Sequence, residues 1–573
     1  MAKPRSTSPE TPVRGEQDFA RYSVEEKLFG KLPPSRLQML EFATPSADGL
    51  RQFTINVWRN HAIESITPML ERYAAFGRWA PDWKIGAYDY TLSFSGHHPA
   101  ALELVWLDPR ELLATLSASG FAGWLHERLL ALRQLSPSPI VLATWNPDGA
   151  LPALLSETLR TIPAVYLADL QVECDAQGVA LIDARTERFA GTPLSAPAQL
   201  CLARKLAVNW LPGLLLPPLK AILVDLDETL YSGALVEDGI DALVLTPAHS
   251  RLQQVLLAQR AAGVFLGVVS RNEAADVEAM FNRRTDFPLT LGDFSVREIS
   301  WANKAEAIAR IATQLRIGLD AVVYVDDNAG ELATVQQQHP RLFTVWAAPD
   351  ADVTAAALEA APGLWRWQRG HDDAVRVHDL EVSSEREKLA AAADDVDSYL
   401  TLLRPRIAVS VDAAELLPRL AELCIKTNQF NLALRRMTAS ELADLMQRAN
   451  ASVSSVALSD RLADSGTVAL IAAERQRRRI VVHELCISCR ALGRQLENSL
   501  VAAALRKMAI FDGCDEIVFN VSVGPRNEPA RRWLASLLGN ASNALADGAF
   551  ALPLRALPQV AAGVAIIDHP HSI

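Results

Sequence analysis

Two aspartates that follow a short apolar run are the residues best suited to chemistry in this chain. Residues 221–224, Ala-Ile-Leu-Val, predict a strand buried on both faces of a parallel sheet. Asp225 and Asp227 follow and are expected at the carboxyl end of that strand, where open α/β sheets bind ligands. Because they lie two residues apart, one carboxylate can attack phosphorus while the other handles a proton. By itself, the segment fits an ordinary acidic turn equally well.

Three later segments supply partners for these aspartates. They are a run at 265–269 that ends in Ser270, Arg271 and Asn272, a run at 321–325 that ends in Asp326 and Asp327, and a helical pattern that starts near Lys304. Carboxylates suit a hard cation such as Mg²⁺, whereas a hydroxyl and an ammonium suit phosphate oxygens. Together these segments predict a phosphoryl-transfer site with a divalent metal.

The order of acid pair, hydroxyl, lysine and acid pair resembles the haloacid dehalogenase (HAD) superfamily of phosphatases and phosphotransferases. The resemblance implies that Asp225 is a nucleophile that becomes an aspartyl-phosphate and that Asp227 is the general acid/base. It also implies phosphate contacts from Ser270, Arg271, Asn272 and Lys304. The implied Mg²⁺ ligands are Asp225, the backbone carbonyl of Asp227, and Asp326, whose role Asp327 could share. The intervals between these motifs are filled by core elements and leave no room for a lid domain. We therefore expect a large substrate, or closure of the site by another domain.

Length and composition predict a cytoplasmic, multidomain α/β protein. The chain has 573 residues, 50% hydrophobic and 21% charged, which suggests about three to four domains. Six cysteines fit a reducing compartment, and no apolar run predicts a membrane span. A net charge of −11 argues against nucleic acid as a partner. The polar residues 1–34 predict a disordered tail and no signal peptide.

Patterning divides the remaining chain into four parts. Residues 35–215 alternate helices with short strands, and Trp106-Leu107-Asp108-Pro109 and Trp145-Asn146 resemble strand ends of the SGNH hydrolase-like domain. No serine nucleophile or Asp/His pair is evident there, which favours a non-catalytic scaffold. A capless HAD-like core is expected at 216–375 and a helical linker at 376–404. Residues 405–573 form the last part.

Residues 405–573 resemble the GNAT acyltransferase fold. Apolar runs at 468–472 and 480–485 predict two strands joined by a turn, and the segment 488–495 leads into a helix. In GNAT proteins such a loop and helix hold the pyrophosphate of coenzyme A. Gln495 stands where that motif has a small residue, and the groove can still admit a phosphopantetheine arm. The arginine-rich turn at 475–479 fits either a solvated hairpin tip or a docking surface for an acidic carrier protein.

All these segments together resemble the FkbH-like proteins, the HAD-IIIC family of polyketide assembly lines. The matching segments are DLDETLYSG at 225–233, SRN at 270–272, WANK at 301–304, DDNA at 326–329, KTNQFN at 426–431 and SCRALGR at 488–494. The resemblance implies transfer of the glyceryl unit of 1,3-bisphosphoglycerate, with removal of phosphate, onto the phosphopantetheine thiol of an acyl carrier protein. It implies a pantetheine or acyl pocket at Asn428, Gln429, Arg490, Gly493 and Arg494. The chain departs from the family pattern at Glu228, Tyr231, Ser232, Arg271 and Ala329.

Cys489 has two interpretations. It could be a catalytic thiol that accepts the acyl unit, because a following helix N-terminus and the charges of Arg490 and Arg494 would favour the thiolate. It could also be a small structural residue at a strand end, since cysteine is often buried. Cys486 forms a CxxC motif with it, but no second ligand pair for zinc is evident.

Two other functions are weighed against carrier loading. The chain could be a plain Mg²⁺-dependent phosphatase of a small phosphate ester, or an inactive scaffold that binds a carrier. The complete set of carboxylates, hydroxyl and lysine argues against the scaffold. The KTNQFN and SCRALGR segments argue against the plain phosphatase.

Overall fold

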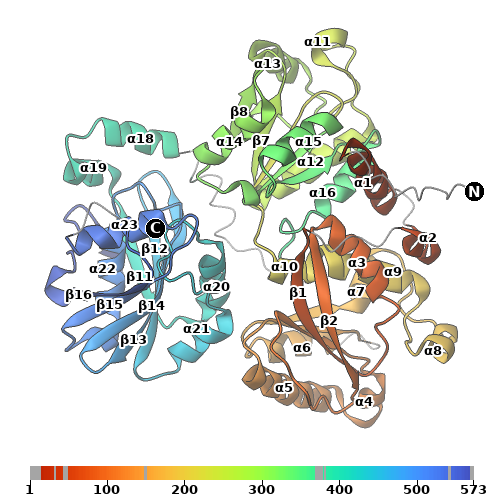
Figure 1. Ribbon diagram of the computed structural model, residues 1–573, viewed down its shortest axis with the longest axis horizontal. Helices are drawn as coiled ribbons and strands as arrows, with labels where there is room; N and C mark the ends of the chain where they lie inside the picture. The colour runs from red at the N-terminus through yellow and green to blue at the C-terminus, as the bar shows by residue number, and fades with distance from the viewer. Residues whose placement is uncertain are drawn as a thin grey trace, which may run out of the picture. The chain divides into compact units, whose positions relative to one another are not determined.

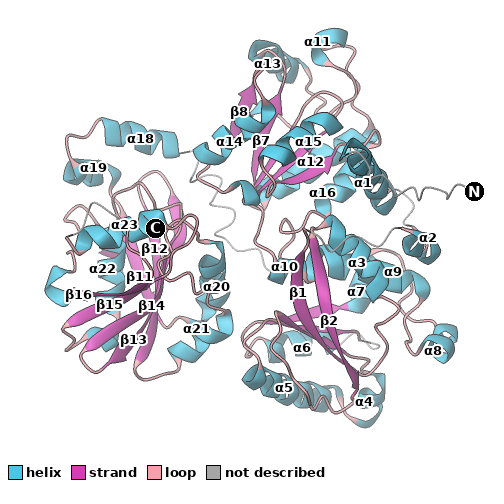
Figure 2. Cartoon of the chain, in the orientation of Figure 1, coloured by secondary structure: helices cyan, strands magenta, loops and turns pink. Residues whose placement is uncertain are grey.

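The computed structural model describes residues 14–30, 34–42, 49–146, 151–367, 379, 382–539 and 544–567. The chain divides into two compact units. The first unit comprises residues 1–46, 75–77 and 219–365, and the second comprises residues 47–74, 78–218 and 366–573. Figure 1 labels their elements, and Figure 2 distinguishes helices from strands. The structure is therefore of mixed α/β class, with parallel sheets in both units.

A five-stranded parallel sheet forms the core of the first unit. Its order is β10-β9-β6-β7-β8. The strands are β6 (Ala221–Val224), β7 (Phe265–Ser270), β8 (Val296–Ile299), β9 (Val322–Asp326) and β10 (Phe343–Trp346). The predicted strands at 221–224, 265–269 and 321–325 are confirmed. Strand order reverses at β6, whose neighbours are β7 on one side and β9 on the other, and such a switch point is where open α/β sheets bind ligands.

Helices connect the strands of this sheet. They are α11 (Leu235–Asp238), α12 (Pro247–Ala261), α13 (Ala274–Arg283), α14 (Lys304–Gln314), α15 (Ala329–Gln338) and α16 (Ala351–Glu359). Gly267 lets β7 approach its neighbours closely, because a Cβ there would lie 2.5 Å from Leu223 Cδ2 and 2.7 Å from Val296 Cγ2. A side chain at this position would displace the buried Leu223 and Val296 side chains on that face of the sheet.

The expectation of a disordered tail over residues 1–34 is wrong for part of that range. Residues Arg14–Phe29 form helix α1, and Arg36–Glu41 form α2. Tyr22, Leu28 and Phe29 on α1 are buried in the first unit. The Tyr22 ring stacks on Trp346 at 5.5 Å between centroids. These scattered aromatic and aliphatic residues supply the apolar burial that composition alone did not reveal.

The second unit begins with another parallel sheet, of order β2-β1-β3-β4-β5. Its strands are β1 (Arg51–Arg59), β2 (Trp79–Tyr88), β3 (Leu102–Trp106), β4 (Ile140–Thr144) and β5 (Val165–Asp169). Its helices are α3 (Thr67–Phe76), α4 (Arg110–Thr115), α5 (Ala118–Leu135), α6 (Leu151–Leu159), α7 (Leu170–Ala176), α8 (Ala184–Ala190), α9 (Ala196–Lys205) and α10 (Pro212–Leu215). The alternation of helices and short strands predicted for this region is confirmed.

The second unit also contains a seven-stranded mixed sheet of order β16-β15-β14-β13-β12-β11-β17. Its strands are β11 (Arg406–Val411), β12 (Ala451–Ser459), β13 (Asp464–Gln476), β14 (Arg479–Ile487), β15 (Glu516–Val521), β16 (Gly548–Pro553) and β17 (Ala565–Ile567). The helices of this region are α18 (Ser383–Ala391), α19 (Val396–Leu403), α20 (Leu417–Lys426), α21 (Ala439–Met446), α22 (Glu497–Lys507) and α23 (Glu528–Leu537). The predicted hairpin is confirmed, since β13 and β14 pair antiparallel around Gln476 and Arg479.

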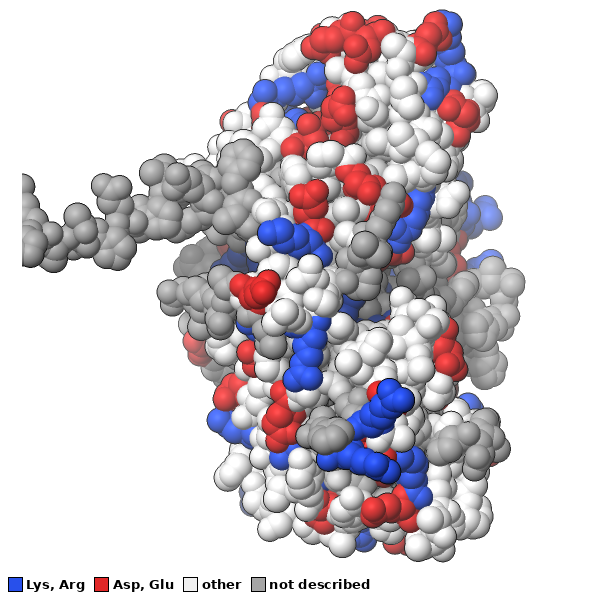
Figure 3. Space-filling view, turned by 90° about the vertical axis from the view of Figure 1, so that its right-hand side faces the viewer, with Lys and Arg blue, Asp and Glu red and all other residues white. Residues whose placement is uncertain are grey.

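The surface carries charges of both signs. The net charge of the chain is −11, and the face in Figure 3 shows acidic and basic side chains interspersed. Among the described residues, no helix is both long enough and apolar enough to cross a membrane.

A buried histidine lies just after β1. The His61 ring stacks on Trp106 at 5.3 Å and meets Trp145 edge-on at 5.5 Å. Its Nδ1 is 3.2 Å from Thr192 Oγ1, whereas its buried Nε2 has no hydrogen-bond partner among the described residues. Burial lowers the pKa of His61 to about 4, although the Asp108 carboxylate opposes this.

We expect the stability of the second unit to fall as pH falls from about 6.5 to about 4. In this window the unfolded chain protonates His61 and the folded chain does not, so stability is fully present above pH 6.5. The loss would be about 3 kcal/mol. Denaturant unfolding followed by tryptophan fluorescence would measure it. His61→Phe keeps an aromatic ring without a titrating group, so the stability of this variant should depend less on pH. Equal pH dependence in the variant and the wild type would show that His61 does not cause the effect.

Candidate active site

Two buried carboxylates meet where β6 and β9 end. The strands pair in parallel with Val224 opposite Val325, so the next residues, Asp225 and Asp326, are adjacent. The Asp225 N–H donates to the Val325 carbonyl at 2.9 Å, which fixes this register. The exposed fraction is 6% for Asp225 and 0% for Asp326. Neighbouring buried carboxylates repel each other, so the arrangement requires a cation.

Lys304 supplies one cation for this pair. It is the first residue of α14, and the Asn303 side chain caps that helix by accepting from the Ala305 N–H at 2.8 Å. Lys304 Nζ lies 2.9 Å from Asp225 Oδ2 and 2.6 Å from Asp326 Oδ2. Burial acts to lower the pKa of Lys304, but the two carboxylates outweigh it and raise that pKa above its usual value. The lysine is therefore held as an ammonium between both acids.

A third carboxylate completes an acidic cluster suited to a metal. One oxygen each from Asp225, Asp326 and Asp327 lies within 4.8 Å of the others. Asp225 Oδ1 is buried and has no hydrogen-bond partner among the described residues. Burial and the charge of Asp326 raise the pKa of Asp225 to about 7 and that of Asp327 to about 6, although Lys304 opposes both shifts. Hard oxygen donors with excess negative charge fit Mg²⁺, which would relieve this repulsion.

Asp227 occupies a different environment. Its Oδ1 accepts from the Tyr231 hydroxyl at 2.8 Å and from the Leu235 N–H at 3.0 Å, and its Oδ2 accepts from Asn272 Nδ2 at 2.8 Å. Three neutral donors thus hold this carboxylate in one orientation. Glu228 follows with φ +50°, a left-handed turn that directs the chain away from the strand. The side chain of Asp227 is not a member of the metal cluster, so its predicted metal role would fall to its backbone carbonyl.

Two buried polar atoms in the segments that follow β6 and β7, Thr229 Oγ1 and Asn272 Oδ1, lack hydrogen-bond partners among the described residues. Ser270 is 2% exposed, and its Oγ accepts from Asn272 Nδ2 at 3.1 Å. Unsatisfied buried groups are costly, so their concentration beside Asp225 and Asp227 is typical of a site that a ligand completes.

The structure brings together most of the predicted phosphate-binding residues. Lys304 pairs with Asp225, Asn272 donates to Asp227, and Ser270 accepts from Asn272. Arg271 behaves differently, because its side chain is 46% exposed and its Nη2 pairs with Glu331 Oε1 on α15 at 2.6 Å. Its guanidinium is thus already engaged by a carboxylate.

Two tyrosines have roles at this site that sequence reasoning did not predict, although Tyr231 stands out there as a departure from the family pattern. Tyr231 donates to Asp227, and Tyr324 makes a short hydrogen bond to Asp326 Oδ2. Burial raises the pKa of both phenols, with Asp227 and Asp326 adding to the shift, so both remain donors at neutral pH. Tyr324 lies two residues before Asp326 on a buried strand, and a hydroxyl within that apolar run was the available signal.

The residues of the predicted pantetheine pocket have varied surroundings. Asn428 Oδ1 accepts from Arg436 Nη2 at 2.7 Å, and Gln429 is half-buried. Gly493 has φ +78°, and Arg490 Nη2 lies 3.4 Å from the Thr467 carbonyl. Arg494 is 4% exposed and donates to both oxygens of Asp379, at 2.8 and 2.9 Å, and to Asp460 at 3.0 Å. Arg494 therefore holds a buried ion cluster together, and the pocket role of the five residues stays a prediction.

Cys489 lies in a turn after β14 and is half-buried. The predicted helix after the segment 488–495 is confirmed as α22, which begins at Glu497. The arginine-rich hairpin tip also differs from a purely basic patch. Arg478 and Arg479 form ion pairs with Asp515 and Glu516, which offsets much of its charge.

Comparison with known proteins gives distant structural matches. No family model matches the chain, and no curated protein matches it significantly. The N-terminal part of BF1531 from Bacteroides fragilis, described as containing a phosphatase domain complexed with Mg, matches with 15% identity and a TM-score of 0.45, over 58% of this chain and 100% of that one. A putative HAD-like phosphatase from Mesorhizobium loti matches 26% of this chain and 89% of its own, with 13% identity and a TM-score of 0.20. A GCN5-related glucosamine N-acetyltransferase region from a fungal β-N-acetylglucosaminidase matches 92% of this chain and 68% of that chain, with 11% identity and a TM-score of 0.16.

We expect Lys304→Met to destabilise the first unit by about 3–5 kcal/mol, because it leaves Asp225 and Asp326 buried without their cation. Added Mg²⁺ should recover more stability in this variant than in the wild type. Thermal unfolding with and without Mg²⁺ would measure both effects. Lys84→Met is the matched control, since Lys84 pairs with Asp82 at the surface, and its change should stay below about 1 kcal/mol. Equal losses in the two variants would contradict the role of Lys304.

Proposed function

We propose that this protein is a Mg²⁺-dependent phosphoryl-transfer enzyme of HAD type, with Asp225 as its nucleophile. The observation that carries this proposal is the buried, unpartnered Asp225 Oδ1, which lies beside an ammonium and two further carboxylates. A nucleophilic carboxylate needs one oxygen held in place and the other available, and Lys304 holds only Oδ2.

The surrounding residues have separate tasks in this reaction. Asp225 Oδ1 attacks phosphorus, forming a new P–O bond while the bond to the leaving oxygen breaks. Asp227 gives a proton to that oxygen and later takes one from the attacking water or acceptor. Tyr231 and Asn272 fix the orientation of Asp227 throughout. Ser270 and Lys304 donate to phosphoryl oxygens, as positioned donors stabilise the developing charge.

Asp225, Asp326 and Asp327 are the residues that would hold Mg²⁺. The ion neutralises negative charge on the phosphoryl group when it is bound. Its positive charge also favours the ionised form of Asp225, which burial alone disfavours.

We propose further that the enzyme also transfers an acyl unit. This unit is the glyceryl group of 1,3-bisphosphoglycerate, and it is placed on the phosphopantetheine thiol of an acyl carrier protein. The KTNQFN and SCRALGR segments support this, since a plain phosphatase has no need of them. In the transfer half-reaction, the Cys489 thiolate attacks the acyl carbon, a C–S bond forms, and the C–O bond to phosphate breaks. The phosphate ester of the donor is cleaved at Asp225 before this transfer, so the unit attached to Cys489 is glyceryl. The pantetheine thiol then displaces the Cys489 thiolate and takes the glyceryl group.

Asp225→Asn should abolish cleavage of the phosphate ester and leave the fold intact, because the amide is nearly isosteric but cannot form the aspartyl-phosphate. The only phosphate still released without a carrier would be the one displaced when Cys489 is acylated, at most one per chain. Phosphate release with Mg²⁺ and 1,3-bisphosphoglycerate, measured over many turnovers, tests this. Asp241→Asn is the matched control, since Asp241 is an exposed carboxylate paired with Arg283 and should retain wild-type release. Wild-type release by folded Asp225→Asn would exclude the HAD assignment.

Incubation with the acyl donor and no carrier should add one glyceryl group to Cys489, and the adduct should be labile to hydroxylamine. Intact-protein mass spectrometry would detect it, and Cys489→Ala should lose it while still releasing phosphate. Cys514→Ala is the control, because Cys514 is buried and lies outside the SCRALGR segment that contains Cys489. Holo carrier protein should then gain the glyceryl mass and apo carrier should not.

Other outcomes distinguish the alternatives. Full loading of holo carrier by Cys489→Ala would mean direct transfer to pantetheine. Rapid phosphate release with no acyl group on any holo carrier would favour a plain phosphatase. No phosphate release at all by the folded wild type would favour an inactive scaffold.

A further inference from the structure

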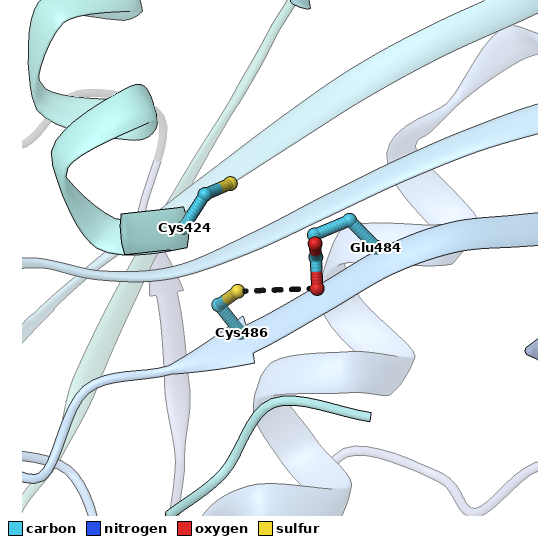
Figure 4. A group of neighbouring side chains, drawn as sticks. All are labelled: Cys424, Glu484 and Cys486. Atoms are coloured by element: carbon cyan, nitrogen blue, oxygen red, sulfur yellow. Dashed lines mark hydrogen bonds between the residues drawn. The ribbon is translucent and has the colours of Figure 1, made fainter. Parts of the chain in front are cut away.

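Three buried side chains that can bind a metal converge at the C-terminal mixed sheet. Glu484 and Cys486 lie two residues apart on β14, so their side chains emerge on the same face. Cys424 reaches that face from α20. Figure 4 shows the two sulfurs and the carboxylate turned toward one another. The three side chains have 0% exposure.

The donor atoms are close enough for one ion. The two Sγ atoms and one carboxylate oxygen all lie within 4.8 Å of one another. Two sulfurs bound to one tetrahedral zinc ion are about 3.8 Å apart, given Zn–S bonds of about 2.3 Å. Small rotations of the side chains would therefore complete the coordination. Thiolate and carboxylate together favour zinc over the hard Mg²⁺.

The Glu484 carboxylate forms no ion pair among the described residues, although the charge of Arg436 acts on it from beyond contact distance. Its Oε2 accepts from the Arg436 backbone N–H at 2.9 Å, and its Oε1 lies 3.6 Å from Cys486 Sγ. The Arg436 guanidinium is directed elsewhere, to the Ile425 carbonyl at 2.5 Å and Asn428 Oδ1 at 2.7 Å. Within the described part of the chain, no lysine or arginine side chain forms an ion pair with Glu484. A fully buried carboxylate in this position calls for a cation.

We propose that Cys424, Glu484 and Cys486 bind one zinc ion, whose fourth coordination position is taken by a solvent molecule. Binding would displace one proton from each thiol, so two protons leave as one Zn²⁺ enters. The net charge of the occupied cluster is −1, and the Arg436 N–H donates into it.

The position of the cluster explains what such a site would do. Cys424 lies two residues before the KTNQFN segment, and Asn431 of that segment forms a backbone bridge to Cys486. Phe430 and Leu432 also exchange backbone hydrogen bonds with β14, at 2.9 and 3.2 Å. A zinc ion would pin the KTNQFN segment to the strand that leads into SCRALGR. The site is independent of the phosphoryl chemistry at Asp225.

Metal analysis of the full chain tests the proposal. Protein purified under reducing conditions from zinc-supplemented cells should contain one zinc per chain. Cys424→Ser and Cys486→Ser should lose it. Cys514→Ser is the matched control, since Cys514 is another buried cysteine of the same region, with its Sγ 3.5 Å from the Ile510 carbonyl. Asp225→Asn should keep its zinc, which separates this site from the Mg²⁺ cluster.

A second measurement on the wild type covers variants that fail to fold. Zinc-depleted protein titrated with Co²⁺ should develop thiolate-to-cobalt charge-transfer absorption in the near ultraviolet, saturating at one Co²⁺ per chain. A folded wild type with neither zinc nor this absorption would mean neutral thiols and overturn the proposal. A non-reduced mass lower by two hydrogens, restored by reductant, would assign Cys424 and Cys486 to a disulfide instead. Zinc retained in both cysteine variants would also refute the site.

Discussion

The ammonium of Lys304 between Asp225 and Asp326 is the interaction on which the candidate active site depends. Two carboxylates with almost no exposure could not ionise side by side without it. A single lysine carries only one positive charge, however, and Asp327 adds a third acid. The site thus has a remaining deficit of positive charge, and a divalent cation with a phosphoryl group is the kind of ligand that balances it. The same excess of negative charge therefore determines both the stability of this acidic cluster and the chemistry proposed for it.

The sheet determines where these groups meet. The β6–β9 pairing sets Asp225 beside Asp326, and the β6–β7 pairing sets Ser270 on the other side. Gly267 leaves room for the Leu223 and Val296 side chains on one face of this sheet, because any side chain there would collide with them. Turn geometry after β6 then separates Asp227 from the metal cluster and surrounds it with neutral donors. Carboxylates two residues apart thereby acquire different environments, as a nucleophile and a proton carrier require.

Features set by local patterns could be predicted from the sequence. Short apolar runs followed by polar residues identified β6, β7 and β9 and the side chains at their ends, because residue alternation and parallel pairing fix these positions. Features set by long-range contacts could not. The ion pairs of Arg494 are one example, because its partners Asp379 and Asp460 are distant in sequence. The CxxC motif associates Cys486 with Cys489 in the sequence, whereas Cys424 and Glu484 are its neighbours in space. Helix α1 was missed because its buried rings are spaced among polar residues.

The ion cluster around Arg494 has a consequence for where the C-terminal part begins as a folding unit. Arg386 donates to Asp379 and Asp460, and Arg494 donates to the same two acids, so two positive and two negative charges balance in the interior. A fragment that began at residue 405 would keep Arg494 and Asp460 but lose Asp379 and Arg386. It would retain a neutral pair of Arg494 and Asp460, but each member would lose the hydrogen-bond partners that Asp379 and Arg386 supply. The helical segment before β11 is in this sense an internal part of the C-terminal sheet, and a self-sufficient fragment has to start upstream of Asp379.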